Sequence, residues 1–90
     1  MRKSEKIGLS AAYDWSNSNI KDDALIFRVL EKHRFEDVAQ VCKRYGMARV
    51  SVLCEGIEDR NVASMLRRML RNIKRGFAQA KSAGLTKTHA

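Results

Sequence analysis

The chain has 90 residues, 44% of them apolar, with no proline and a formal net charge of +8. This length suits one small domain, and the apolar content excludes a fully disordered chain. No run approaches the roughly 20 apolar residues of a membrane span, and the basic start lacks the apolar block of a secretory signal. We therefore expect a cytoplasmic protein with no membrane partner.

The net positive charge lies entirely in the last third of the chain. Residues 1–59 hold ten Lys or Arg and ten Asp or Glu, whereas residues 60–90 hold eight Lys or Arg and no acid. A surface of one sign attracts an opposite polymer or an acidic partner at range. The composition therefore favours a binding protein over an enzyme.

The cysteines and histidines do not indicate a metal site. Cys42 and Cys54 each lie among apolar residues, which favours buried structural thiols over a disulfide or a reactive thiol. Without a CxxC spacing, and with only His33 and His89 beside them, they do not match a zinc-ligand pattern. We expect neither a metal nor another cofactor.

The start of the chain differs in pattern from the rest. Residues 1–12 are polar and lack apolar periodicity, so we expect a flexible N-terminal arm. A single helical domain is predicted over residues 13–84, and residues 85–90 form a C-terminal tail. The turn-forming stretch 13–19 contains Trp15, whose large ring is expected to pack on the body of the domain.

Two helices are predicted in the first half of the domain. The first is expected from about Ile20 to Lys32, with Asn19 as its N-cap and a break near His33-Arg34. The second covers 35–45, with acids in its first turn and bases in its last, as the helix dipole favours.

Glycines mark the next boundaries. Gly46 is expected to end the second helix as a left-handed residue. Residues 47–56 fit either a short helix or a strand. We favour a short helix closed by Gly56, because a lone strand would have no partner.

The last helix is predicted from about Asn61 to Ala83, with Gly84 as its stop. Apolar residues recur on one side of it: Met65, Leu66, Met69, Leu70, Ile73, Phe77 and Ala80. Cations gather on the other side, within an arc of about 140°: Arg60, Arg67, Arg68, Arg71, Lys74, Arg75 and Lys81. At 1.5 Å per residue this helix would span roughly 35 Å, so we expect its far end to extend beyond the body.

These elements predict an all-α fold of three main helices and a short connecting helix. Apolar residues from all of them are expected to form the core: Trp15, Leu30, Phe35, Val38, Val41, Tyr45, Leu66, Leu70 and Ile73. We expect the chain to form a homodimer or to be held in a complex with another protein.

The two sides of the last helix suggest two binding roles. Its cations are expected to bind nucleic acid, DNA or RNA, through the phosphates, or else an acidic protein; a merely solvated face is the alternative. Its apolar side would pack on the domain, and Trp15, Met65, Met69 and Phe77 are candidates for docking a partner. Binding to a membrane surface is disfavoured, because the helix lacks an interfacial Trp.

Two further motifs suggest other functions. Cys42, Gly46 and Val52 have spacings compatible with a helix-turn-helix, but Glu55, Glu58 and Asp59 would repel phosphates there. Arg28 and His33 show the Arg-x4-His spacing that resembles HEPN-type ribonucleases, in which such a pair would act on a ribose hydroxyl. The chain is short for that helical bundle, so a small ribonuclease is the less favoured alternative.

One stretch of the sequence carries a family resemblance. The residues concerned are Tyr13-Asp14-Trp15-Ser16-Asn17, Asp23-Ala24-Leu25-Ile26, Val29-Leu30-Glu31, Arg34-Phe35-Glu36-Asp37 and Tyr45-Gly46. Over residues 13–50 the chain resembles short bacterial antitoxin-like proteins encoded beside abortive-infection nucleotidyltransferase toxins. The resemblance implies a toxin-like partner and DNA binding for autoregulation. We therefore expect an antitoxin or small regulator, with a general nucleic-acid-binding domain as the alternative.

Overall fold

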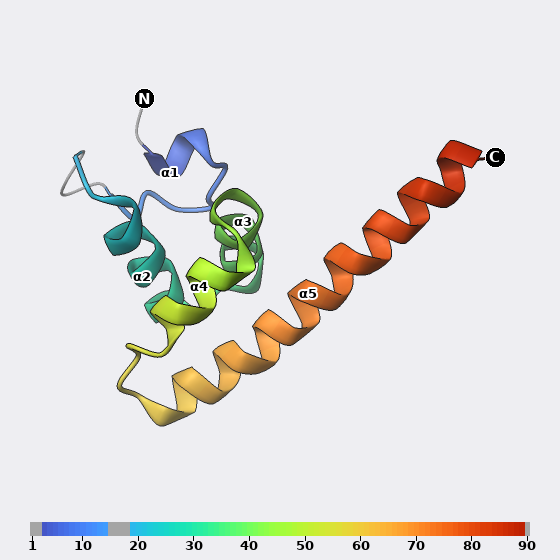
Figure 1. Ribbon diagram of the computed structural model, residues 1–90. Helices are drawn as coiled ribbons and strands as arrows, with labels where there is room; N and C mark the ends of the chain where they lie inside the picture. Colours follow the sequence, from blue (N-terminus) through green and yellow to red (C-terminus); the bar gives the residue numbers. More distant parts are fainter. Residues whose placement is uncertain (1–2, 15–18, 90) are drawn as a thin grey trace.

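The computed structural model describes residues 3–14 and 19–89, and their side chains as far as Ala80. The described residues form helices joined by short turns, and no strand occurs among them (Figure 1). The helices are α1 (Lys3–Lys6), α2 (Asp22–Lys32), α3 (Phe35–Tyr45), α4 (Met47–Cys54) and α5 (Arg60–His89). The predicted all-α class is confirmed, including the short connecting helix α4 and the long basic α5. The one-turn helix α1 was not predicted.

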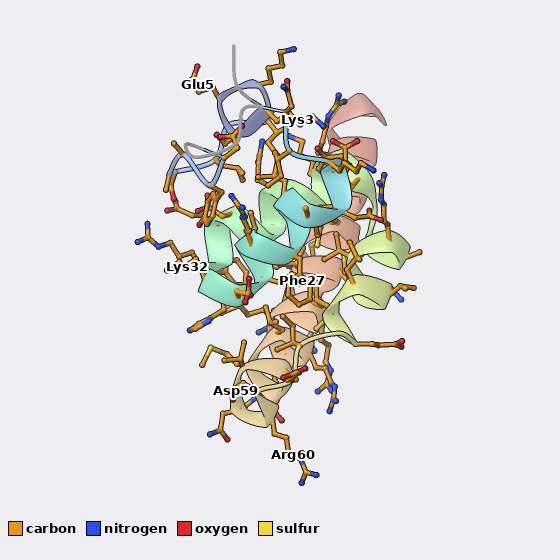
Figure 2. The ribbon with its side chains drawn as sticks, turned by 90° about the vertical axis from the view of Figure 1, so that its left-hand side faces the viewer. Lys3, Glu5, Phe27, Lys32, Asp59 and Arg60 are labelled. Carbon is orange, nitrogen blue, oxygen red and sulfur yellow. The ribbon has the colours of Figure 1, made fainter. Side chains whose placement is uncertain are left out.

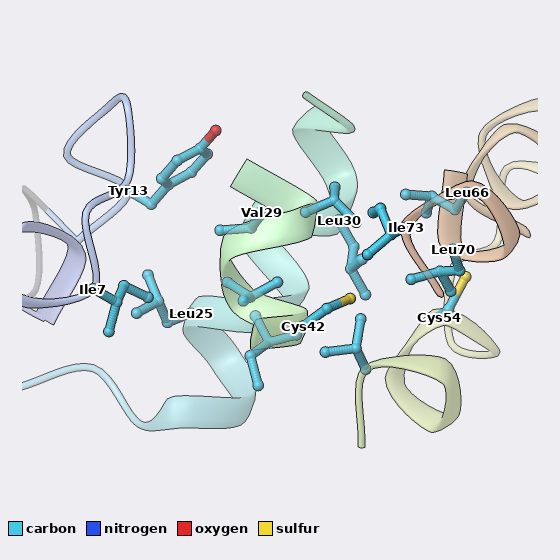
Figure 3. Close-up of a cluster of buried hydrophobic side chains, with 14 of the residues drawn as sticks. Ile7, Tyr13, Leu25, Val29, Leu30, Cys42, Cys54, Leu66, Leu70 and Ile73 are labelled. Carbon is cyan, nitrogen blue, oxygen red and sulfur yellow. The ribbon is translucent and has the colours of Figure 1, made fainter. Parts of the chain in front are cut away.

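The core lies where α2, α3 and α4 meet the first half of α5 (Figure 3). Each helix contributes apolar side chains at intervals of three and four residues, which places them on one face. The fully buried ones are Leu25, Ile26, Val29, Leu30, Val38, Val41, Val50 and Leu66. Leu70 and Ile73 of α5 close the same cluster.

Two of the predicted core aromatics do not lie in the core as expected. Phe35 is 50% exposed, so its placement there was wrong. It is the first residue of α3, a turn away from the buried Val38 and Val41, and therefore lies at the rim of the core. Tyr45 is only partly buried against the core. The prediction for Trp15 falls outside the described residues.

Residues 3–12 pack on the body, which differs from the flexible arm expected over residues 1–12. Ile7 belongs to the core, and Ser4 is buried with its hydroxyl donating to the Asp14 carboxylate. The Ser10 backbone N–H donates to the Asp37 carboxylate of α3 at 2.8 Å. Hydrogen bonds to two buried carboxylates and the burial of Ile7 hold this segment in place, although it has no apolar periodicity.

The turns around α2 and α3 show one shifted boundary and two residues with positive φ. α2 begins at Asp22 rather than Ile20, and its N-cap is the extended Lys21 instead of Asn19. Ile20 is buried in the core, which holds it outside the helix. His33 (φ 43°, ψ 41°) is left-handed at the predicted break after α2. Gly46 ends α3 as predicted and has a positive φ of 96°, but its ψ of 146° lies outside the left-handed helical region that was expected.

The end of α5 differs from the prediction. Gly84 was expected to stop the helix, but α5 continues to His89. A glycine inside an exposed helix costs about 1 kcal/mol relative to alanine, which weakens a helix without ending it. Because the chain has no proline, nothing in residues 85–89 forces a stop.

Candidate functional site

The start of α5 is fixed by a capping carboxylate. Asp59 Oδ1 accepts hydrogen bonds from the backbone N–H groups of Asn61 and Val62, at 2.9 and 3.2 Å. A carboxylate at this position satisfies free N–H groups and interacts well with the helix dipole. Asp59 therefore holds the first turn of α5 at the base of the domain, where Figure 2 shows Arg60 extending away from the body.

One side of α5 anchors the helix to the domain. Ala63, Leu66, Leu70 and Ile73 are buried against the other helices. At about 100° per residue these four positions fall within an arc of about 80°. This anchored stripe fixes which side of α5 faces solvent, and it confirms the predicted core residues of the helix.

The opposite side carries a surface that we call the basic face. All of its described side chains are exposed. They are Arg60, Arg67, Arg68, Arg71, Lys74 and Arg75. The side chain of Lys81, also predicted for this surface, lies outside the described ones. The structure thus brings six of the seven predicted cations together along one helix.

The cations of the basic face are not neutralised within the described part of the chain. The ion pairs among the described residues lie on other elements: Lys3 pairs with Asp22 at 3.0 Å, and Arg49 pairs with Asp23 at 2.7 Å. Arg67 lines a hollow of about 320 Å³ together with Glu55, yet these two side chains do not form an ion pair. The positive charge of the basic face is therefore available to a ligand.

The second half of α5 leaves the body of the domain. Every described side chain after Ile73, from Lys74 to Ala80, is exposed. Figure 1 shows this part of the helix running clear of α1–α4. The expectation that the far end extends beyond the body is confirmed. Since none of the helices α1–α4 covers this part of α5, it has room for a large ligand.

The predicted docking residues have different environments. Met65 is 38% exposed and Phe77 37% exposed, whereas Met69 is partly buried against the core. Phe77 lies on the same side of α5 as Leu66, Leu70 and Ile73. It stays exposed because the helix has by then run past the rest of the domain. Trp15, the remaining candidate, falls outside the described residues.

Arg28 and His33 have local partners in the structure. Arg28 Nη1 donates to the backbone carbonyl oxygen of Tyr13 at 2.9 Å, which holds the N-terminal segment against α2. His33 caps α2, and its Nδ1 lies 3.0 Å from the carbonyl oxygen of Glu31. These contacts give both residues of the Arg-x4-His motif a structural role.

The helix-turn-helix interpretation fails on the connection between α3 and α4. A single residue, Gly46, joins the two helices, whereas that unit uses a turn of about three or four residues. Arg49 on the would-be recognition helix is paired with Asp23 and lies over the Tyr45 ring, 5.3 Å from its centroid.

Both cysteines are buried and free, which confirms the predicted structural thiols. Burial raises the pKa of the Cys42 thiol to about 11. It also raises the pKa of Cys54, although the nearby Arg67 opposes that shift. Among the described residues no group of three or more His, Cys, Asp or Glu could hold a metal ion, and no helix is long and apolar enough to cross a membrane.

Sequence reasoning missed two groups of polar residues. Asp14 and Asp37 are buried carboxylates that hold the N-terminal segment, and isolated acids in a sequence do not reveal such a role. Asn72 and Gln79 are exposed on α5, and a count of charges overlooks them. Helical spacing could have placed these two residues beside the cations.

Comparison with known proteins gives no relative from which a role could be transferred. No protein-family model, curated protein or solved structure matches the chain. The function is therefore argued from the residues of α5.

Proposed function

We propose that the protein is a non-enzymatic binding protein that holds nucleic acid on the basic face of α5. The observation that carries this proposal is the set of six exposed cations on one side of a single helix, none of which forms an ion pair within the described part of the chain; residues 60–90 also contain no acid. A solvated surface helix usually mixes charges of both signs. A helix surface that carries only positive charge is attracted to the negatively charged phosphates of nucleic acid.

The side-chain chemistry supports phosphate as the ligand. Five of the six described cations on the basic face are arginines, whose planar guanidinium binds phosphate in a bidentate manner. Each phosphate neutralised releases condensed counterions, which supplies affinity that does not depend on nucleic-acid sequence. A rigid helix anchored by Leu66 and Leu70 presents these groups without a large ordering cost.

A variant matched in charge tests the proposal. Replacing Arg67, Arg71 and Arg75 with Gln should weaken binding to a 20-base-pair DNA duplex by at least about tenfold in moderate salt. The control replaces Lys32, Lys43 and Arg44 with Gln, which removes the same charge from exposed positions outside α5. Fluorescence anisotropy measures the DNA affinity of both triple variants. Equal losses of affinity in the two variants would show that only net charge matters, and would refute the proposal that the basic face binds the DNA.

A second candidate function, that of an antitoxin, rests on the exposed apolar residues of α5. Met65 and Phe77 are large apolar side chains in contact with solvent, and such residues serve as anchors in protein interfaces. The partner proposed is the toxin-like protein implied by the resemblance of residues 13–50.

Co-purification from the native host tests this candidate. A complex with the product of a neighbouring toxic gene, lost in Phe77→Ser, would support the antitoxin role. Elution of the chain as a monomer would contradict the antitoxin role. Elution as a homodimer would also contradict it and would indicate that Met65 and Phe77 serve self-association.

A further inference from the structure

Four exposed polar side chains form a straight row along α5. Arg68, Asn72, Arg75 and Gln79 follow one another at intervals of four, three and four residues. At about 100° per residue they fall within an arc of about 60°. We call these four residues the polar row. It shares its two arginines with the basic face and adds two amides.

The polar row points directly away from the domain. Its centre lies about 170° around the helix from the centre of the buried stripe formed by Ala63, Leu66, Leu70 and Ile73. The remaining cations lie on one side of the helix, between the polar row and the buried stripe; among them are Arg67, Arg71 and Lys74. The body of the domain therefore does not obstruct a ligand that approaches the row.

The side chains of the row match the edges of base pairs. Arginine forms bidentate hydrogen bonds with guanine O6 and N7, and asparagine or glutamine does so with adenine N6 and N7. Arg68 and Gln79 are separated by about 16 Å along the helix, which equals the rise of roughly five base pairs. A flank of cations beside such a row would contact the phosphates of one strand.

The geometry favours duplex DNA over other nucleic acids. An α-helix with its side chains is about 10–12 Å across, and the major groove of B-DNA is about 12 Å wide, whereas that of an RNA duplex is too narrow for side chains to read. Single strands are bound by stacking on aromatic rings. Neither the polar row nor the basic face contains an aromatic residue.

We infer that α5 enters the major groove of duplex DNA, with Asn72 and Gln79 contacting adenine and Arg68 and Arg75 contacting guanine. This inference rests on the proposed function and specifies its ligand. Because the polar row lies opposite the buried stripe along its whole length, the helix can lie in the groove while the domain stays outside it, and the exposed segment after Ile73 extends the contact.

Binding of the full chain to four probes tests the inference. The probes are a randomised 20-base-pair DNA duplex pool, one duplex selected from that pool, its separated single strand and the RNA duplex of the same sequence. We expect the selected DNA duplex to bind at least about tenfold more tightly than the single strand or the RNA duplex. Sequencing of the bound pool should show a preference for adenine and guanine over about five base pairs.

Two double variants separate base contacts from phosphate contacts. Replacing Asn72 and Gln79 with Ala, at exposed helical positions that tolerate alanine, should abolish the adenine preference and reduce the affinity for the selected duplex by about tenfold or more. Replacing Arg71 and Lys74 with Gln should weaken binding to every duplex alike and leave the preference intact.

The outcomes distinguish the inference from the proposed function. Equal binding of the RNA duplex or the single strand, or an adenine preference unchanged in the Asn72 and Gln79 variant, would overturn the inference and leave the proposed function standing. Absence of binding to all four probes would overturn both. Selective binding of the DNA duplex with loss of the adenine preference in that variant would support both.

Discussion

The hydroxyl of Tyr13 donates a hydrogen bond to Asp37 Oδ2 at 2.6 Å and so joins the N-terminal segment to α3. Both side chains are buried, and Ser10 donates to the same carboxylate. Burial, together with the Asp37 carboxylate, raises the pKa of Tyr13 to about 12. This contact makes residues 3–14 part of the domain that holds α5.

Removing that hydroxyl should destabilise the fold. In Tyr13→Phe the buried Asp37 carboxylate loses one charge-assisted hydrogen bond, so the free energy of unfolding should fall by about 1.5–3 kcal/mol. Urea unfolding followed by circular dichroism measures it. Tyr45→Phe is the matched control, because its hydroxyl donates to the more accessible Asp22 at 3.0 Å, and the loss should be smaller. A larger loss in the control would contradict this account of the N-terminal segment.

Acid should destabilise the protein through its carboxylates. Burial alone would raise the pKa of Asp37, but hydrogen bonds from Ser10 and Tyr13 and the charge of Arg34 outweigh it and hold the pKa below the ordinary 3.8. The hydrogen bond from Lys3 lowers the pKa of Asp22 in the same way.

A carboxylate with a lowered pKa contributes its full stability above its unfolded value, and that stability is lost as the pH falls through the folded value. The free energy of unfolding should therefore decline from about pH 5 downward. Urea titrations between pH 7 and pH 2.5 measure the decline, which should be shallower in Asp22→Asn. A stability that rises toward low pH would contradict the assignment.

The anchored and the projecting parts of α5 should respond differently to truncation. Leu66 is fully buried, so Leu66→Ala should cost about 2–5 kcal/mol of the free energy of unfolding. Phe77 lies on the same stripe but is exposed, so Phe77→Ala should cost less than about 1 kcal/mol. Thermal and urea unfolding of the two variants test this. Similar losses would mean that the end of α5 packs against the domain.

The two thiols should be unreactive in the folded protein. With a pKa of about 11, Cys42 is almost entirely protonated at pH 8, and its side chain is buried. In a Cys54→Ser background, Cys42 should react with a disulfide reagent at least about a hundredfold more slowly than in guanidinium chloride. Equal rates with and without denaturant would show that Cys42 is accessible.

The sequence predicted the helices and their buried faces better than it predicted the packing between segments that are distant in the chain. The 3.6-residue periodicity of α3 and α5 is set by the residues of each helix, so their buried faces could be read directly. Packing between elements that are distant in the sequence could not. Ile7 and Phe35 show this: Ile7 lies in a polar segment yet joins the core, whereas Phe35 continues an apolar pattern yet lies at its rim.

The candidate site was predictable as a surface, because its cations all come from one helix and need only helical spacing to meet. What the sequence did not indicate is whether acids from other elements neutralise that surface. Only the packed structure shows that Arg67 and Glu55 line the same hollow without forming an ion pair.

The salt dependence of DNA binding tests the central claim, that the basic face of α5 holds phosphates. The logarithm of the association constant should fall linearly with the logarithm of the salt concentration, with a slope of about −0.9 for each phosphate contact. Replacing Arg67, Arg71 and Arg75 with Gln should make that slope shallower by about 2.7, and the Lys32, Lys43 and Arg44 control should leave it unchanged. An unchanged slope in the α5 variant would show that the phosphates are bound elsewhere.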